Sequence, residues 1–154
     1  MPTPALIDPR GPRFGAGITS VLLLSVIYLS LTGASTAALV MLGALSALFA
    51  WGTVAGVGRH PYAALFKVLV RPFLTAPREL ESAEAPTFAQ GVGLAVTLAG
   101  VILGLMGFSA AVVVAAAAAF VAAFLNAVFD YCLGCQLYLL LVRGGYIAPP
   151  ATTS

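Results

Sequence analysis

The sequence predicts an all-α integral membrane protein whose four transmembrane helices form two hairpins. Of its 154 residues, 61% are hydrophobic and only 8% are charged, whereas a soluble domain carries roughly 25% charged residues. Four apolar runs are each about as long as the roughly 20 residues that cross a hydrocarbon core, or longer. The seven Lys and Arg residues fall in segments that four crossings would place on one side of the membrane.

The first predicted hairpin consists of the apolar runs 14–31 and 37–57, which the uncharged break Thr32-Gly33-Ala34-Ser35 separates. Each run is long enough for one crossing. Residues 1–13 lack the apolar core and the adjacent small-residue cleavage site of a secretory signal. We therefore expect them to be retained as a cytoplasmic leader.

Residues 58–87 are predicted to form a cytoplasmic interfacial segment between the two hairpins. From Tyr62 to Arg71, apolar residues recur at helical spacing while Lys67 and Arg71 share the opposite side. This pattern predicts an amphipathic helix lying in the membrane interface. Pro72 should end that helix, because a proline disfavours the α conformation of the residue before it.

The second predicted hairpin consists of the runs 88–108 and 110–142, followed by a cytoplasmic tail at 143–154. An unbroken helix over 110–142 would be roughly 50 Å long, which exceeds one crossing. We therefore expect the last helix to tilt, protrude or bend. Gly134 is the expected position of a bend.

The basic residues predict the topology. With four spans and cytoplasmic termini, every cation faces the cytoplasm and both outer loops are uncharged, as the positive-inside rule requires. Three or five spans would instead place the N-terminal and C-terminal cations on opposite faces. The residues that carry this prediction are Arg10, Arg13, Arg59, Lys67, Arg71, Arg78 and Arg143.

Two short matches between the halves suggest a duplicated hairpin. Residues 14–18 resemble residues 88–92, and residues 69–71 resemble residues 141–143, at offsets of 74 and 72 residues. Both copies would start on the cytoplasmic side, so the repeats would be parallel rather than inverted.

Small residues are spaced for close contact between helices, which drives helix association in lipid. They occur in the pairs Gly52 with Gly56 and Gly100 with Gly104, and in the run Ala115 to Ala119. They could pack within one bundle or form a dimer face, and the sequence does not specify the oligomeric state.

The two cysteines of the chain form a single C-x-x-C motif, Cys132 and Cys135. On a helix they would be neighbours on one face, within the distance that a disulfide permits. In a reducing compartment such a pair is more often catalytic or metal-binding than structural. These cysteines are therefore the candidate catalytic residues. The alternative is that they only pack as small apolar residues.

Asp130 and Asn126 lie one helical turn apart just before the cysteines and predict an inward polar stripe. An ionisable group at membrane depth is a functional candidate. On a regular helix, however, Asp130 would point about 200° away from Cys132. It would therefore either accept a proton from a thiol after a local deformation or pair with a cation such as Arg59.

His60 is the only histidine, and in a duplicated chain it would match the position of Cys132. His60 or Arg59 near the thiols would favour the thiolate; alternatively, His60 only caps a helix end. Zinc binding would need about four ligands, for example the two thiols with His60 and Asp130. Nothing in the spacing demands that set, so no metal is predicted.

Other function classes leave no signature in the sequence. No basic stripe with stacking aromatics indicates nucleic-acid binding. The chain contains no phosphate-binding loop, dinucleotide fingerprint or Ser-His-Asp arrangement. We therefore predict no cofactor and no nucleic-acid partner, and the lipid bilayer is the one environment that the composition requires.

Two motifs resemble the family of small bacterial membrane proteins described as domain of unknown function 4395. They are Cys132-Leu-Gly-Cys-Gln-Leu-Tyr138 in the last helix and Pro86-Thr-Phe-Ala-Gln-Gly-Val-Gly93 at the start of the third. The second contains Gln90, which joins the supporting polar residues, and Thr87, where the family pattern has an arginine. The resemblance extends from about Asp8 to Arg143.

The resemblance implies a multi-pass protein of the bacterial inner membrane, associated with a thioredoxin- or rhodanese-type partner. Combined with the C-x-x-C pair, it favours a thiol-disulfide or sulfur-transfer component that uses a soluble thiol partner. The alternative is a non-enzymatic membrane subunit or a small sulfur-anion transporter, in which the cysteines assist passage or only pack.

Overall fold

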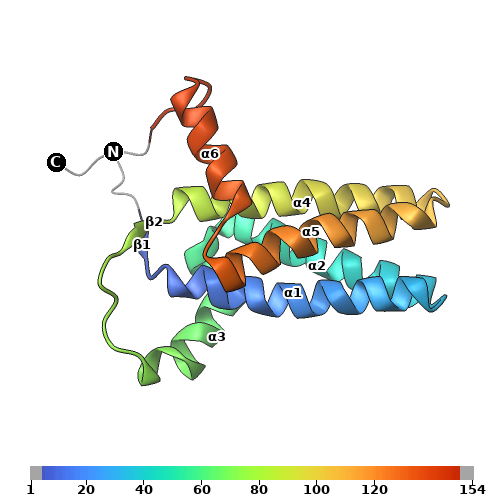
Figure 1. Cartoon of the computed structure of the whole chain (residues 1–154), viewed down its shortest axis with the longest axis horizontal. Helices are drawn as coiled ribbons and strands as arrows, with labels where there is room; N and C mark the ends of the chain where they lie inside the picture. Colours follow the sequence, from blue (N-terminus) through green and yellow to red (C-terminus); the bar gives the residue numbers. More distant parts are fainter. Residues whose placement is uncertain (1–4, 150–154) are drawn as a thin grey trace.

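A computed structural model describes residues 5–149 as four long helices lying side by side, with two shorter helices at one end (Figure 1). The long helices are α1 (Arg10–Leu31), α2 (Ser35–Ala55), α4 (Glu84–Leu105) and α5 (Ser109–Phe129). All four are long and apolar enough to cross a membrane. The prediction of an all-α protein with four candidate spans is thereby confirmed.

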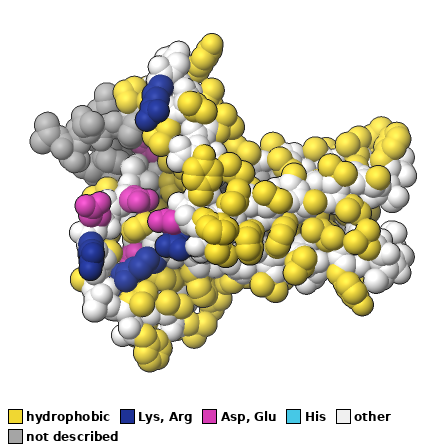
Figure 2. All heavy atoms as spheres, viewed as in Figure 1, with side chains coloured by type: hydrophobic (Ala, Val, Ile, Leu, Met, Phe, Trp, Pro, Cys, Tyr) yellow, Lys and Arg dark blue, Asp and Glu magenta, His cyan; other side chains and the backbone are white. Residues whose placement is uncertain are grey.

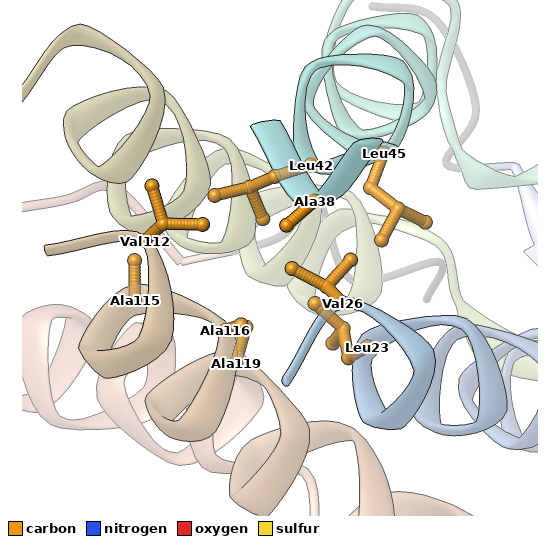
Figure 3. Packing of buried hydrophobic residues seen from close by; sticks show 9 residues of the cluster. All are labelled: Leu23, Val26, Ala38, Leu42, Leu45, Val112, Ala115, Ala116 and Ala119. Atoms are coloured by element: carbon orange, nitrogen blue, oxygen red, sulfur yellow. The ribbon is translucent and has the colours of Figure 1, made fainter. Parts of the chain in front are cut away.

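The core of the bundle lies in the half that contains the turns after α1 and α4. Figure 3 shows nine buried apolar residues that meet there from α1, α2 and α5. The α5 face is built mostly of alanines, and an added side chain on Gly104 of α4 would lie 2.6 Å from Val112. The small residues Gly100, Gly104 and Ala115 therefore permit close packing inside this bundle.

Two amphipathic helices diverge from the opposite end of the bundle (Figure 1). Helix α3 (Pro61–Leu69) packs on α1, and α6 (Leu133–Arg143) packs on α4. Helix α3 is the amphipathic helix that the sequence predicts, and it ends before Pro72, which lies in the short helical turn η2 (Arg71–Phe73). The other short turn, η1 (Val57–Arg59), links α2 to α3.

A two-stranded antiparallel sheet joins the two halves at the same end. Strand β1 (Leu6–Ile7) pairs with β2 (Glu81–Ser82), with Leu6 opposite Ser82 and Ile7 opposite Glu81. The residues before α1 and before α4 are thereby held together. Asp8, which follows β1, binds Arg10 and lies 3.7 Å from the Nε of Arg71.

Every Lys, Arg, Asp and Glu of the chain lies at this end. Figure 2 shows their side chains gathered around the β-strands and the two short helices, while the far end of the bundle carries none on the face shown. The physical reason is that α1 and α4 begin here and α2 and α5 end here, so all charged segments meet. The far connections, residues 32–34 and 106–108, contain no charged residue.

The run 110–142 is interrupted, as its length led us to expect, but not at Gly134. Helix α5 ends at Phe129, where Asp130 adopts a left-handed conformation with φ 56°. The N–H of Tyr131 then donates to the Leu125 carbonyl at 3.2 Å, which closes the helix end. The bend expected at Gly134 lies instead at Asp130, because an aspartate tolerates the left-handed region better than most residues do.

The two halves share one order of elements. Helices α4 and α5 begin and end 74 residues after α1 and α2, and α6 begins 72 residues after α3. The packing follows the same order, since α1 lies against α5 as α4 lies against α2, and α3 lies on α1 as α6 lies on α4. Each half therefore consists of two long helices followed by a short helix that packs on the first of them.

Candidate functional site

A cavity of about 830 Å³ lies at the charged end of the molecule. Its walls come from all six α-helices and from both strands. It extends into the bundle as far as Leu45 and Ala119, which belong to the buried core. Ligand sites in proteins commonly have volumes of about 300–1,000 Å³, so the cavity is large enough for a small molecule.

Cys132 and Cys135 form a disulfide in the wall of this cavity, with their α-carbons 5.2 Å apart. Cys132 is extended and immediately precedes α6, so the pair spans the start of a helix rather than the helix face that the sequence predicts. The Sγ of Cys132 accepts a hydrogen bond from the Cys135 N–H at 3.2 Å. A helix N-terminus is electropositive and favours a thiolate once the pair is reduced.

Helix α6 is seated firmly on the first turns of α4. Gly134 touches Ala89, and an added Cβ would lie 2.5 Å from the Ala89 Cβ. One turn later, the Tyr138 hydroxyl donates to a Glu84 carboxylate oxygen at 2.9 Å, and its ring lies 5.6 Å from that of Phe88. Burial, and then the bond to Glu84, raise the pKa of Tyr138, which therefore stays a donor. These contacts hold the cysteines at the cavity wall.

Asp130 pairs with Arg13, not with Arg59 as the sequence suggested. The Arg13 Nε lies 3.6 Å from Oδ1 of Asp130, and another nitrogen of Arg13 donates to the Ala127 carbonyl at 3.3 Å. The helix break brings the carboxylate beside α1, which explains the change of partner. The Asp130 side chain is 67% exposed, so the ion pair contributes little to stability. Arg59 is exposed, and its carbonyl accepts the Trp51 indole N–H at 3.2 Å.

His60 caps α3 as Cys132 caps α6. Its Nδ1 accepts the Tyr62 N–H at 3.1 Å, so its Nε2 carries the proton and donates to the Leu48 carbonyl at 3.1 Å. The residue is only 4% exposed, and burial lowers its pKa. His60 lines the same cavity as the cysteines. However, its two ring nitrogens are already bound to the backbone, which is the helix-cap arrangement.

Gln90 on α4 and Asn126 on α5 place two neutral amide groups in the cavity wall. Gly52 makes room for Gln90, because an added Cβ there would lie 2.8 Å from the Gln90 side chain. Within residues 5–149, neither side-chain amide has a hydrogen-bond partner in the protein. Nearby, the Thr87 hydroxyl accepts the Val57 N–H at 3.2 Å and links α4 to η1.

The predicted site residues therefore meet at one cavity, with one exception. The cavity wall contains both cysteines, Asp130, Asn126, His60 and Gln90, whereas Arg59 is not part of it. No group of three or more metal-ligating side chains occurs within residues 5–149. The zinc set considered from the sequence is therefore not formed there.

Sequence reasoning missed three residues that position the site, namely Arg13, Glu84 and Tyr138. The tyrosine is part of the C-L-G-C-x-x-Y motif, and this was the available signal for it. Arg13 and Glu84 lie 117 and 54 residues before their partners Asp130 and Tyr138. No local pattern connects residues that are so far apart in the chain.

The family model described as Domain of unknown function (DUF4395) matches residues 7–143. These residues include the whole four-helix bundle, both short helices and the cysteine pair. No match was found among curated proteins, and none among solved structures. The chain therefore belongs to the DUF4395 family.

Proposed function

We propose that the protein is a thiol-disulfide or sulfur-transfer component of the bacterial inner membrane, with Cys132 as the attacking residue and Cys135 as the resolving one. The observation that carries the proposal is the position of Cys132 as the cap of α6. There its sulfur accepts a backbone N–H at 3.2 Å and lies within disulfide distance of Cys135. A thiolate at that place is stabilised and has a built-in resolving partner.

The reaction with a soluble disulfide is a pair of exchanges. The Cys132 thiolate attacks one sulfur of the partner and releases the other as a thiolate, which forms a mixed disulfide. The Cys135 thiolate then attacks Sγ of Cys132. The products are the Cys132–Cys135 disulfide, as observed, and the reduced partner. The reverse sequence oxidises the partner.

A persulfide partner of the rhodanese type follows the same geometry. The Cys132 thiolate would attack the outer sulfur of the partner's persulfide and take it, and the partner would leave as a thiolate. Cys135 would then attack Sγ of Cys132 and release hydrosulfide, which again leaves the observed disulfide. The two partner classes therefore differ in whether hydrosulfide is produced.

The proposed orientation places both termini and the cavity on the cytoplasmic side. It is supported by the concentration of all seven cations at the end of the bundle that carries α3 and α6. The exposed leucines of both short helices suit the membrane interface. We further propose that the halves arose by duplication in parallel orientation, which the offset of 74 residues supports.

The alternative function is a membrane subunit or a carrier for sulfur anions. Arg13, Lys67 and Arg71 in the cavity wall favour that alternative. Two of these cations are already near carboxylates, since Arg13 faces Asp130 and Arg71 faces Asp8. The cavity also ends at the apolar core. The arrangement therefore supports exchange at the surface more than passage through the bundle.

Trapping of a mixed disulfide tests the proposal. Cys135→Ser removes the resolving thiol, so a thioredoxin- or rhodanese-type partner should accumulate on Cys132 and migrate with it on non-reducing gels. Cys132→Ser is the matched control, since serine preserves the helix cap, and it should trap nothing. Equal trapping by both variants, or by neither, would refute the assigned roles.

Accessibility to an impermeant maleimide tests the orientation separately. After mild reduction, intact cells should leave Cys132 and Cys135 unlabelled, whereas inverted membrane vesicles should label them. A cysteine introduced at the exposed Thr32, in the far connection, in a Cys132→Ser/Cys135→Ser background is the control. It should show the reverse pattern because this turn lies at the opposite end of the bundle from the charged residues. Labelling of the native pair in intact cells would contradict the cytoplasmic assignment.

A further inference from the structure

We propose that the cavity binds a lipid-soluble quinone, which accepts two electrons from the reduced Cys132 and Cys135 pair and restores their disulfide. This inference rests on the proposed thiol exchange in its reverse direction, in which the disulfide oxidises the partner and becomes the dithiol, and it adds the acceptor for the two electrons. Three features of the cavity support it: its depth in the bundle, its neutral polar groups, and the presence of the thiols in the same wall.

The depth of the cavity favours a lipid-soluble ligand. Its inner wall is formed by apolar residues of candidate spanning helices, including Leu45 and Phe49 of α2 and Val96 of α4. In the proposed orientation these residues lie deeper in the membrane than the interfacial helices α3 and α6. A ligand that fills about 830 Å³ there must tolerate an apolar environment, as a lipid-soluble molecule does.

The polar groups of the cavity favour neutral carbonyl oxygens over an anion. Gln90 and Asn126 present amides from different helices, and neither has a protein partner within residues 5–149. Their N–H groups can each donate to one oxygen of a quinone ring. The cations Arg13 and Arg71 lie near carboxylates, and Lys67 is exposed. The negative charge of a phosphate headgroup would therefore be poorly neutralised in the cavity, whereas a neutral quinone needs no such neutralisation.

The stoichiometry of the thiol pair also matches a quinone. Each sulfur loses one electron and one proton as the S–S bond between Cys132 and Cys135 forms. The quinone gains both electrons and both protons and leaves as the hydroquinone. Atoms and charge balance without any further reactant, and the product is the disulfide state described above.

The first experiment measures a single turnover on the whole purified protein in detergent. The reduced protein is mixed without oxygen with decylubiquinone, whose fully substituted ring forms no thiol adduct. We expect one hydroquinone for each disulfide formed. The Cys132→Ser/Cys135→Ser double variant sets the background rate, and a wild-type rate no faster than this background would overturn the electron transfer.

The second experiment separates binding from chemistry with a pair of adjacent substitutions on α5. Ala122 lines the cavity, whereas Val121 is 52% exposed on the outer surface. Decylubiquinone binding can be followed by quenching of the only tryptophan, Trp51. Ala122→Phe should weaken binding about tenfold or more, because the ring overfills the site. Val121→Phe should leave it unchanged and corrects for partition into the detergent.

A polar variant covers the case in which Ala122→Phe does not fold. Asn126→Leu conserves the volume and removes one donor, so binding should weaken about threefold to tenfold. Equal binding by wild type and every folded cavity variant, or displacement of the quinone by equimolar phospholipid, would overturn the site.

The trapping assay keeps the two proposals apart. If the soluble partner is trapped but no cavity variant alters quinone binding, only the quinone site is refuted. If quinone binding depends on Ala122 but neither a trapped partner nor hydroquinone is found, the thiol function and the electron transfer are refuted. The ligand site then still stands.

Discussion

The two short helices α3 and α6 occupy matching places in the two halves, yet only α6 carries the cysteine pair. His60 caps α3 and Cys132 caps α6, and both residues line the same cavity. The histidine is 4% exposed with both nitrogens bound to the backbone. Cys132 instead forms a disulfide with Cys135, three residues away. In the proposed function, the first half therefore stabilises the site, while the second half supplies the thiols.

The seating of the two helices differs as well. On the first half, Gly15 of α1 accommodates the Tyr62 ring of α3; on the second, Gly134 of α6 approaches Ala89 of α4. The small residue thus lies on the long helix in one case and on the short helix in the other. Gly134 brings α6, which bears the cysteines, close to the backbone of α4. Such a backbone contact leaves α6 less freedom to move than the side-chain contact of Tyr62 leaves α3.

The largest expected effect comes from substituting these two glycines. An alanine at 134 would place its Cβ 2.6 Å from the backbone Cα of Ala89, which cannot yield. We expect Gly134→Ala to cost about 1–3 kcal/mol, to lift α6, and to speed alkylation of the reduced cysteines. Gly15→Ala would meet only the Tyr62 ring, at 3.2 Å, and should cost less. Thermal unfolding in detergent and thiol labelling can be measured for both variants. Equal effects would contradict the difference between the two helix contacts.

A reciprocal exchange at the ends of α2 and α5 should change stability by a similar amount. Gly56 has φ 85° and ψ 151°, a region that only glycine adopts readily, whereas Asp130 has φ 56° and ψ 33°. Gly56→Asp should therefore destabilise the protein by about 1–3 kcal/mol. Asp130→Gly loses an exposed ion pair and gains a tolerant backbone, so its change should stay below about 1 kcal/mol. Melting temperatures in detergent test this order, and a greater loss from Asp130→Gly would reverse it.

The smallest expected effect is a pH dependence confined to the first half. Burial lowers the pKa of His60 below its ordinary 6.5, so the unfolded chain binds the proton more readily than the folded one. The stability from neutral His60 is thus complete above about pH 6.5 and declines as the pH falls towards the lower folded pKa. His60→Asn keeps a capping acceptor and should abolish this dependence. Amide hydrogen exchange of α3 and α6 as a function of pH measures this dependence. An equal loss of exchange protection in both helices at low pH would contradict the assignment to His60.

Much of the fold was predictable because it depends on local properties. The four candidate spans follow from the length and hydropathy of each run, and α3 follows from the spacing of Lys67 and Arg71 opposite an apolar face. The helix break did not follow, since 110–142 is apolar on both sides of Asp130. Closure by the Tyr131 N–H and capping by Cys132 separate α5 from α6, and neither changes the hydropathy pattern.

Four apolar helices, clustered charges and a paired thiol could be predicted before the structure was known, because these features depend on residue type and spacing along one segment. The folded arrangement was needed to show that Gln90, Asn126, His60 and the cysteines share a cavity, and that Arg13 is the partner of Asp130. These relations depend on α1 packing against α5 and α2 against α4. Such packing joins residues from opposite halves of the chain, and no local pattern encodes it.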